Sequence, residues 1–458
     1  MRILVVGGVA AGMSAAAKAA RTAPGTEVSV YTDEAEISYS ACSLPYFISG
    51  AVTSRDELIA RTPEEMAGRG VQVYVGHRVT GLLHREKCIQ VRTPAGEELV
   101  VPYDRLILAT GASPVTLKLP GATLKGIFTL RSISDATQIQ RYLQCRRPER
   151  AVIIGGGLIG VEMAETFASM GMGVTILEKR EQILPTLDSD MAVLMRNRLE
   201  EVGVEIRCGQ EILAFEGTGQ VSGVRTTQGM VPSELVLQSI GMRPNNDLAV
   251  QAGICLGERG AILVDGRMHT SHQDILAAGD CATAYHISGG YSTYMPMGTT
   301  ANKQGKVAGA NAAGGEAWFP GMNGTAICKA FQWEAARTGL STREALRLGI
   351  EVWQVIVAGY TRASGYPGRG PMTVKLLMRE SDDVLVGGQI VGAEGAGKRI
   401  DVLAAMIQTG QTPAGLARLD LAYAPPFSPV WDPLLTAANR AVSVIEQREV
   451  TKERWEGN

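Results

Sequence analysis

Short apolar runs alternate with longer stretches of helical periodicity at the start of this chain. The first apolar run, residues 3–6, is followed by an alanine-rich stretch at 13–20 and by a second apolar run at 28–31. Short apolar runs bounded by glycine turns predict buried strands, and an intervening helix makes the strand–helix–strand unit of a parallel sheet. The N-terminus is therefore expected to begin a doubly wound α/β domain.

The same order of elements returns further along the chain. Residues 151–154 read as a strand, a helix continues to about residue 170, and residues 174–177 read as the next strand. Two such units predict an α/β chain with two Rossmann-like domains.

The last third of the chain has its own pattern. Strands are expected at 352–357, 372–378 and 384–391, with a helix at about 399–410. Apolar residues recur at helical spacing in that helix, so one face can pack on a sheet or on a partner subunit. Prolines then make the following loop rigid. The apolar positions of the helix are Ile400, Leu403, Ala404 and Ile407. The prolines of the loop are Pro425, Pro426 and Pro429.

Composition and charge narrow the class of protein. A chain of 458 residues is long enough for two to four domains, and a net charge of −2 argues against bulk nucleic acid or an anionic membrane as partner. No apolar run is long enough to span a bilayer. The seven cysteines form no C-x-x-C pair and have no histidine at zinc spacing, so we expect no metal site, no secreted disulfide framework and a cytoplasmic location.

The second glycine-rich turn is a full dinucleotide fingerprint. Gly155, Gly157 and Gly160 occupy the three positions of G-x-G-x-x-G between a strand and a helix. Glu178 ends the next strand, where a carboxylate accepts the ribose hydroxyls of NADH and disfavours the extra phosphate of NADPH. Lys179 and Arg180 follow directly and can reach such a phosphate, so NADPH stays open.

The first turn is a variant of the same fingerprint. Gly7 and Gly12 hold the outer positions, but Val9 replaces the middle glycine. The next strand ends at Thr32 rather than at an acid, and we take Asp33 as the candidate for the adenosine ribose. Two turns imply two nucleotides, and the natural pairing is a bound flavin with an exchanging nicotinamide.

One cysteine has a position that favours redox chemistry. Cys42 lies about thirty residues after the first turn, and Pro45 indicates that a helix begins beside it. A helix N-terminus favours the thiolate, which is the reactive form. No second cysteine is near in sequence, so a redox-active Cys42 must pair with a small thiol, a sulfur atom, oxygen or a distant cysteine.

The order of these motifs resembles the single-cysteine group of pyridine nucleotide-disulfide oxidoreductases over essentially the whole chain. Within that group the chain is most similar to coenzyme A-disulfide reductases, persulfide reductases and NADH oxidases. The motifs that carry the resemblance are Gly7–Gly12, Ser38–Gly50 around Cys42, Thr110-Gly111-Ala112, Gly155–Gly160, Gly279-Asp280 and Tyr423–Pro429.

The resemblance implies three modules and a homodimer. An FAD domain comprises residues 1–112 and 245–322, with an NAD(P)H domain inserted at 113–244. A C-terminal α/β dimerisation domain follows at 323–445, with a tail at 446–458.

It also implies the residues of the site. Cys42 is the redox residue, and Tyr423 and Tyr366 approach it from the other protomer. For FAD the expected residues are Gly7, Gly8, Ala11, Gly12, Asp33, Val79, Thr110, Gly111, Asp280, Thr299 and Ala301. For NADH or NADPH they are Gly155, Gly157, Ile159, Gly160, Glu162, Glu178 and Gly241. For the substrate they are Lys18, Arg21, Ser38, Ser43 and Asn302.

The expected activity is reduction of a small disulfide, persulfide or polysulfide by NAD(P)H through FAD and Cys42, with coenzyme A as substrate or bound thiol. Ala10 and Ala11 stand where the peroxidase and oxidase branch has a histidine, which disfavours oxygen as acceptor. Oxygen nevertheless stays open, as does an electron-transfer reductase for a ferredoxin- or rubredoxin-type carrier. A flavin-bound redox sensor is the third alternative.

Overall fold

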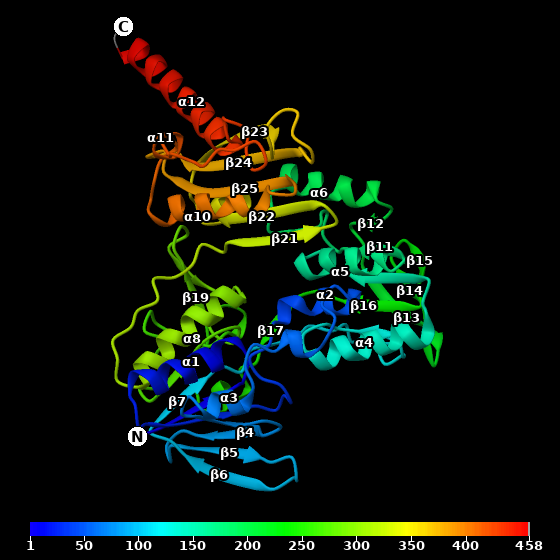
Figure 1. Cartoon of the computed structure of the whole chain (residues 1–458), viewed down its shortest axis with the longest axis vertical. Helices are drawn as coiled ribbons and strands as arrows, with labels where there is room; N and C mark the ends of the chain where they lie inside the picture. The colour runs from blue at the N-terminus through cyan, green and yellow to red at the C-terminus, as the bar shows by residue number, and fades with distance from the viewer. Residues whose placement is uncertain (457–458) are drawn as a thin grey trace.

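The first domain is built on a parallel sheet in the order β18-β7-β1-β2-β3. This computed structural model describes the backbone of residues 1–456 and the side chains of residues 1–450. Helices α1 (Ala10–Thr22) and α8 (Gly298–Ala312) lie side by side against the sheet (Figure 1). The strands are β1 (Arg2–Val6), β2 (Glu27–Tyr31), β3 (Val71–Tyr74), β7 (Arg105–Leu108) and β18 (Ile275–Ala277).

A small antiparallel sheet covers the other face of this domain. Its apolar side chains Leu82 and Ile89 share a buried core with Leu4 and Leu106 of the parallel sheet. Its strands are β4 (Arg78–Leu83), β5 (Cys88–Arg92) and β6 (Glu98–Pro102).

The second domain repeats the parallel arrangement in the order β12-β11-β10-β16-β9. Its strands are β9 (Ile127–Phe128), β10 (Arg150–Ile154), β11 (Gly173–Leu177), β12 (Glu205–Arg207) and β16 (Leu235–Gln238). Its helices are α4 (Ile133–Arg146), α5 (Leu158–Ser169) and α6 (Ser189–Glu201). A side sheet adds β13 (Ile212–Thr218), β14 (Gln220–Thr226) and β15 (Gly229–Pro232).

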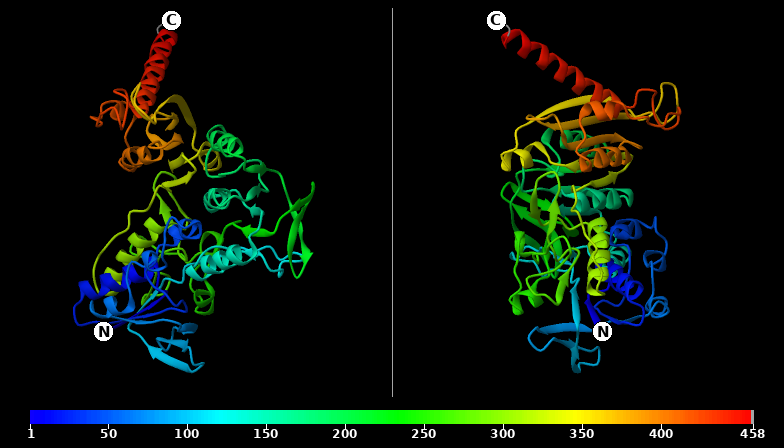
Figure 2. Two further views of the ribbon diagram at one scale, coloured as in Figure 1. Left: turned by 45° about the vertical axis from the view of Figure 1, so that its right-hand side comes forward. Right: turned by 90° about the vertical axis from the view of Figure 1, so that its left-hand side faces the viewer.

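The third domain is an antiparallel sheet in the order β21-β22-β25-β24-β23 with helices on it. Its strands are β21 (Ala326–Ala330), β22 (Trp333–Gly339), β23 (Val352–Tyr360), β24 (Pro371–Arg379) and β25 (Leu385–Ala393). Its helices are α9 (Thr342–Arg347), α10 (Ile400–Gln408), α11 (Pro413–Ala417) and α12 (Pro433–Glu456). Figure 2 shows α12 extending away from the rest of the molecule.

Short elements complete the fold. Strands β8 (Ala112–Pro114) and β17 (Met242–Pro244) pair antiparallel where the chain enters and leaves the second domain. The others are α2 (Leu44–Ser49), α3 (Pro63–Ala67), α7 (Asp247–Gln251), β19 (Ala284–His286) and β20 (Tyr291–Thr293). In the described part of the chain, no helix has the length and hydropathy needed to cross a membrane.

The predicted α/β fold class is confirmed, with two differences at the C-terminal domain. Strands β21 and β22 were not predicted, because polar and small residues interrupt their apolar positions. The predicted boundary at residue 445 falls inside α12, so residues 446–456 continue a helix rather than form a separate tail.

Candidate active site

The first glycine turn has the backbone geometry of a dinucleotide cradle. Gly7 has a φ of 112°, which favours glycine, and a Cβ on Gly12 would overlap the carbonyl oxygen of Gly7. Helix α1 begins after Val9 without a side-chain cap, so its first amide groups remain available to an anion. These residues fit the pyrophosphate of FAD, and Val9 shows that the middle position tolerates a side chain.

Distant segments meet beside this turn. A Cβ on Gly279 would lie 2.6 Å from the Ala11 Cβ and 3.5 Å from the Ala301 Cβ, so Gly279 lets the end of β18 approach both helices. Asp280 follows and is largely buried there. Burial raises the pKa of the Asp280 carboxyl and nearby Arg131 opposes this rise. The predicted residues Ala11, Asp280 and Ala301 are therefore brought together.

Other predicted FAD residues lie around this cluster in different ways. Thr110 donates from Oγ1 to the carbonyl of Asn245 at 2.6 Å, and Asn245 donates to the Thr110 carbonyl at 2.8 Å. Gly8 accepts a bond from the Ser38 amide at 2.9 Å. Gly111 adjoins Arg131, Thr299 is exposed in the first turn of α8, and Val79 is half-buried in the small sheet.

The acidic residues after β2 differ in their surroundings. Asp33 is exposed, and its role at the ribose stays a prediction. Glu34, which we had not selected, accepts a 2.6 Å bond from Arg131 Nη1 and another of 2.6 Å from the Tyr39 hydroxyl. Arg131 comes from the segment before α4, so no pattern near β2 could have indicated this pair.

The second glycine turn repeats the cradle for another nucleotide. A Cβ on Gly160 would overlap the Gly155 carbonyl oxygen, whereas a Cβ on Gly157 would meet no atom within 4 Å. Helix α5 has no side-chain cap, and Ile159 in its first turn is 38% exposed. Gly241 has a φ of 123° and directly precedes the returning strand β17.

Glu178 is held rigidly beside this turn. Its Oε2 accepts the Gly156 amide at 2.8 Å and its Oε1 accepts the Arg180 amide at 2.9 Å. Only 8% of the residue is exposed. Lys179 is paired with Glu211 at 2.9 Å. The fixed carboxylate keeps free lone pairs for a ribose diol.

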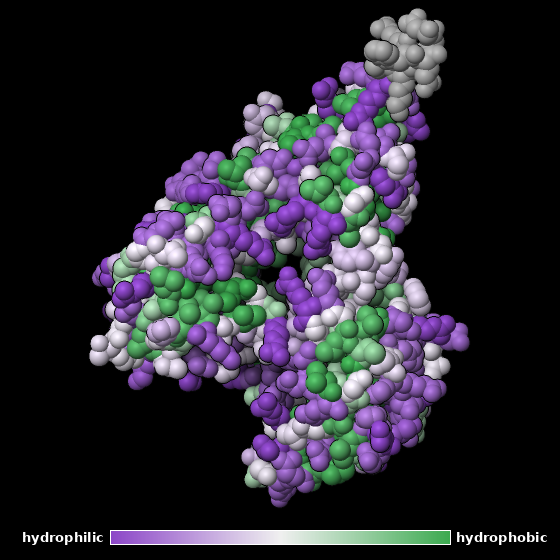
Figure 3. All heavy atoms as spheres, turned by 180° about the vertical axis from the view of Figure 1, so that it is seen from behind, coloured by the Kyte–Doolittle hydropathy of each residue, from purple (hydrophilic) through white to green (hydrophobic). Residues whose placement is uncertain are grey.

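The helix that follows the cysteine joins the two nucleotide domains. Cys42 is exposed and lies in a 3₁₀ turn, Ala41–Ser43, that leads directly into α2. Helix α2 packs on α4 and α5, where Thr166 Oγ1 donates to the Pro45 carbonyl at 3.3 Å and Gln140 donates to the Phe47 carbonyl at 2.7 Å. The cysteine therefore lies where the first domain meets the second. Seen from behind, the surface of the molecule is hollowed near its centre (Figure 3).

The prediction of a favoured Cys42 thiolate is wrong, because the surroundings of the thiol raise its pKa. One side of Cys42 is open to solvent, but the protein around the other sides partly buries the thiol and raises its pKa. The carboxylates of Glu162 and Asp280 raise it further. The single 3₁₀ turn and the six-residue helix offer no cation to oppose these two charges.

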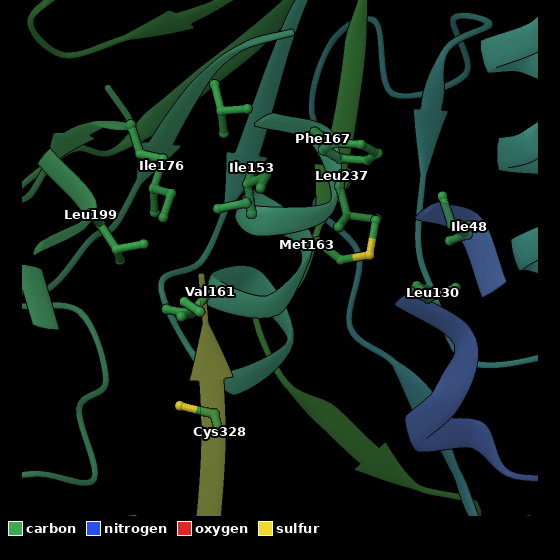
Figure 4. Packing of buried hydrophobic residues seen from close by; sticks show 14 of the residues in the cluster. Ile48, Leu130, Ile153, Val161, Met163, Phe167, Ile176, Leu199, Leu237 and Cys328 are labelled. Atoms are coloured by element: carbon green, nitrogen blue, oxygen red, sulfur yellow. The ribbon is translucent and has the colours of Figure 1, made fainter. Parts of the chain in front are cut away.

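The charge of Glu162 acts on two thiols, that of Cys42 and that of the buried Cys328. Burial, with a smaller effect of Glu165, raises the pKa of Glu162 to about 7. Burial, followed by the Glu162 charge, raises the pKa of Cys328 to about 12. Figure 4 shows Cys328 on β21 near α5, with Ile48 of α2 on the opposite side of α5. Neither the Glu162 pKa nor the position of Cys328 was predictable from sequence.

Replacing Glu162 with glutamine is expected to make Cys42 react faster. Because Glu162 ionises as the pH rises through about 7, its charge opposes ionisation of the thiol above that pH. Removing this charge lowers the Cys42 pKa, and at pH 8 the alkylation rate should rise about threefold. The measurement is iodoacetamide labelling of the Cys42 peptide by mass spectrometry. Glu165→Gln is the matched control, and an equal rise in that variant would contradict the assignment.

The two tyrosines lie on loops of the third domain that contact each other. Tyr366 is 38% exposed and Tyr423 is 50% exposed. The Ala363 amide donates to the Pro425 carbonyl at 3.2 Å and joins the two loops. Figure 1 shows α11, which precedes Tyr423 in the chain, well apart from α2. The approach of the two tyrosines to Cys42 of another protomer stays a prediction.

The predicted substrate residues lie in three places: Ser38 and Ser43 in the segment around Cys42, Lys18 and Arg21 on α1, and Asn302 on α8. Ser43 Oγ lies 2.7 Å from Ser40 Oγ, and Ser14 Oγ donates to Asn302 Oδ1 at 2.7 Å. Ser38 has a φ of 48°, an uncommon conformation for a residue other than glycine. Lys18 is half-buried and Arg21 exposed on α1.

Two dinucleotide cradles with one thiol between them define a flavin- and nicotinamide-dependent oxidoreductase. Sequence comparison agrees, because residues 1–314 match the pyridine nucleotide-disulphide oxidoreductase model and residues 325–434 match the dimerisation domain of the same family. The chain belongs to the pyridine nucleotide-disulphide oxidoreductase family. Members of this family use FAD and NAD(P)H, and the dimerisation domain indicates a homodimer.

Similar proteins cover almost the whole chain. The NAD(P)H coenzyme A polysulfide/persulfide reductase of Pyrococcus horikoshii is 37% identical over 95% of this chain and 97% of its own length. An NADH oxidase of Methanocaldococcus jannaschii is 34% identical over 98% and 100%. The solved structure of an NAD-dependent persulfide reductase from A. fulgidus superposes with a TM-score of 0.93, at 35% identity, over 98% of this chain and 84% of that one.

Proposed function

We propose that this protein uses NAD(P)H and FAD to reduce a coenzyme A-linked disulfide or persulfide through Cys42. For the disulfide, NADH and a proton supply two electrons and two hydrogens, so one disulfide becomes two thiols. For the persulfide, the same electrons yield one thiol and hydrogen sulfide. The favoured acceptor chemistry follows from relatives named for coenzyme A, polysulfide and persulfide.

The position of Cys42 carries this proposal. Two carboxylates raise the pKa of the thiol: that of Glu162, on the helix that follows the second cradle, and that of Asp280, at the first cradle. Cys42 precedes a helix that packs on the second domain. No disulfide joins it to another cysteine in the described residues. A thiol so placed, without a resolving partner, suits an acceptor that brings its own second sulfur.

Different residues of the chain have different roles in the proposed reaction. When bound, FAD would supply a hydride acceptor for NADH and two electrons for the reduction of sulfur. The first cradle and Asp280 hold it, and the second cradle with Glu178 orients the nicotinamide nucleotide. Cys42 attacks the acceptor disulfide, releases one thiol and keeps the other half of the acceptor as a mixed disulfide. Two electrons and two protons that originate from NADH and solvent then reduce this mixed disulfide, which releases the second thiol and restores the Cys42 thiol. Tyr423 and Tyr366 of a second protomer protonate or orient the leaving thiolate.

An anaerobic acceptor panel tests this function. NADH oxidation is followed with coenzyme A disulfide, coenzyme A persulfide and inorganic polysulfide, and the Cys42 peptide is analysed by mass spectrometry under non-reducing conditions. We expect turnover with a coenzyme A acceptor and an adduct of coenzyme A mass on Cys42. Turnover with none of the three sulfur acceptors would refute the proposal.

Oxygen reduction is the second candidate, favoured by the NADH oxidases among the relatives. In that reaction Cys42 cycles through a sulfenic acid, and water is the product. Fast oxygen consumption with a Cys42 sulfenic acid, and slow turnover with every sulfur acceptor, would select it.

Replacing Glu178 with alanine is expected to shift the coenzyme preference toward NADPH. The fixed carboxylate is placed to accept ribose hydroxyls and to repel a 2′-phosphate, so its removal should lower kcat/KM for NADH about tenfold. The value for NADPH should not fall. The measurement is kcat/KM for both coenzymes with one acceptor.

Glu211→Gln is the control, because Glu211 pairs with Lys179 in the exposed part of the same region. It should change kcat/KM for NADH less than about twofold. Equal losses with NADH and NADPH in Glu178→Ala would show that Glu178 does not recognise the ribose.

A further inference from the structure

A row of three polar side chains is buried across the sheet of the third domain. Lys375 on β24 pairs with Gln389 on β25, and Gln389 pairs with Arg337 on β22. Residues opposite each other in a sheet point to the same face. All three are at most 3% exposed, which is unusual for such residues unless they are paired.

Each of them reaches one segment of the second domain, and Arg337 also pairs with Glu344 of its own domain at 2.7 Å. Lys375 Nζ lies 2.9 Å from Asp188 Oδ2 and 2.8 Å from Asp190 Oδ2. Gln389 donates to Asp188 Oδ2 at 2.9 Å and accepts the Asp188 amide at 2.9 Å. Arg337 donates to the Thr186 carbonyl at 2.6 Å. Figure 1 shows α6, which begins in this segment, lying against the sheet of the third domain.

Residues of α9 add further hydrogen bonds to the same segment. The Thr342 amide and hydroxyl donate to Asp188 at 3.0 and 2.9 Å, and Arg343 donates to the Pro185 carbonyl. Burial acts to raise the pKa of the Asp188 carboxyl, but Lys375 and Thr342 outweigh it and hold the pKa below its usual value. The Asp188 carboxyl is therefore ionised at neutral pH.

The same segment touches the second glycine turn. The Leu184 amide donates to the Gly156 carbonyl at 2.7 Å, and a Cβ on Gly156 would lie 2.6 Å from Ile183 Cγ2. The Gly156 amide in turn donates to Glu178. Leu184 has a φ of 46°, a conformation that costs a non-glycine residue energy and that its surroundings must hold.

We propose that Lys375 is a positioning residue for the nicotinamide nucleotide, through which the dimerisation domain holds segment 183–190 against the glycine turn. The proposal rests on the assignment of that turn to NAD(P)H. Lys375 fixes Asp188 and Asp190, the segment fixes Gly156, and Gly156 fixes Glu178. Loss of the lysine leaves buried charge unpaired, so the segment moves and the cradle loosens.

The test measures NAD⁺ binding to the FAD-loaded dimer together with NADH kinetics. In Lys375→Met we expect the NAD⁺ dissociation constant and the KM for NADH to rise about tenfold, with kcat changed less than about twofold. Lys375→Arg should recover most of the affinity. FAD content, dimer state and reoxidation of chemically reduced enzyme by its acceptor should match the parent protein.

Two further variants keep the test decisive. Lys329→Met removes another lysine that crosses from the same sheet to the second domain, where it pairs with Glu165 at 3.8 Å in a more exposed place. It should leave NAD⁺ affinity unchanged within about twofold. If Lys375→Met does not fold, Gln389→Leu removes two bonds to Asp188 without stranding a charge and should still weaken NAD⁺ binding about threefold.

The outcomes separate this inference from the proposed function. Gly160→Ala, which disrupts the turn itself, reports the assignment of the nucleotide site. If Gly160→Ala abolishes NAD⁺ binding but Lys375→Met and Gln389→Leu bind as the parent does, the positioning role is refuted. If Gly160→Ala keeps normal NAD⁺ affinity, the assignment of the turn is refuted instead.

Discussion

A Cys42→Ser enzyme is expected to lose turnover with coenzyme A disulfide or persulfide by at least about a thousandfold. Serine keeps the size of the side chain but cannot form the mixed disulfide or accept electrons as sulfur does. The nucleotide cradles do not contain Cys42, so NADH should still reduce the flavin at a rate close to that of the parent protein. The measurement combines anaerobic steady-state turnover with stopped-flow flavin absorbance.

Cys145→Ser and Cys255→Ser are suitable controls, because both cysteines are exposed and belong to neither glycine turn. Both variants should keep parental turnover. If Cys42→Ser instead reduced its acceptor at the parental rate, electrons would leave the flavin without this thiol. An electron-transfer reductase for a carrier protein would then be the better interpretation.

Adding one methyl group to each glycine turn is expected to separate the two nucleotide sites. In Gly12→Ala the new Cβ overlaps the Gly7 carbonyl, so α1 cannot pack on the turn and the protein should lose FAD. In Gly160→Ala the new Cβ overlaps the Gly155 carbonyl. This variant should retain FAD but lose at least about a hundredfold in kcat/KM for NADH.

Flavin content by absorbance and NADH reduction kinetics measure these two effects. Gly173→Ala is the control, because a Cβ there would make only ordinary contacts, 3.8 Å from the Glu149 carbonyl oxygen, in a strand without positive φ. It should keep both nucleotides. Loss of FAD from a folded Gly160→Ala protein would reverse the assignment of the two turns. Retention of FAD in Gly12→Ala would refute the assignment of the first turn.

The elements with strong apolar patterns were predicted best. The strands before both glycine turns, and β23, β24 and β25, were found within a few residues of their ends. Strand β22 was missed because Arg337 stands among its inward positions. Its burial is compensated by Glu344 on the following helix and by the Thr186 carbonyl, which comes from another domain.

The ionisation of the candidate site shows the limit of local reasoning. The position of Cys42 before a helix predicted a stabilised thiolate from its immediate neighbours. The structure surrounds the thiol with the charges of Glu162 and Asp280, which are 120 and 238 residues away along the chain. Their effect on the Cys42 pKa depends on distances that no local pattern contains.

The amino-acid sequence by itself determined the fold class, both glycine turns and the one cysteine singled out for redox chemistry. These features depend on backbone conformation and on the periodicity of neighbouring residues, which act over a few positions. Only the tertiary structure decided which carboxylates face Cys42, that Arg131 pairs with Glu34, and that Lys375 reaches Asp188 in another domain. Such contacts arise when burial brings distant segments together and forces each buried charge to find a partner.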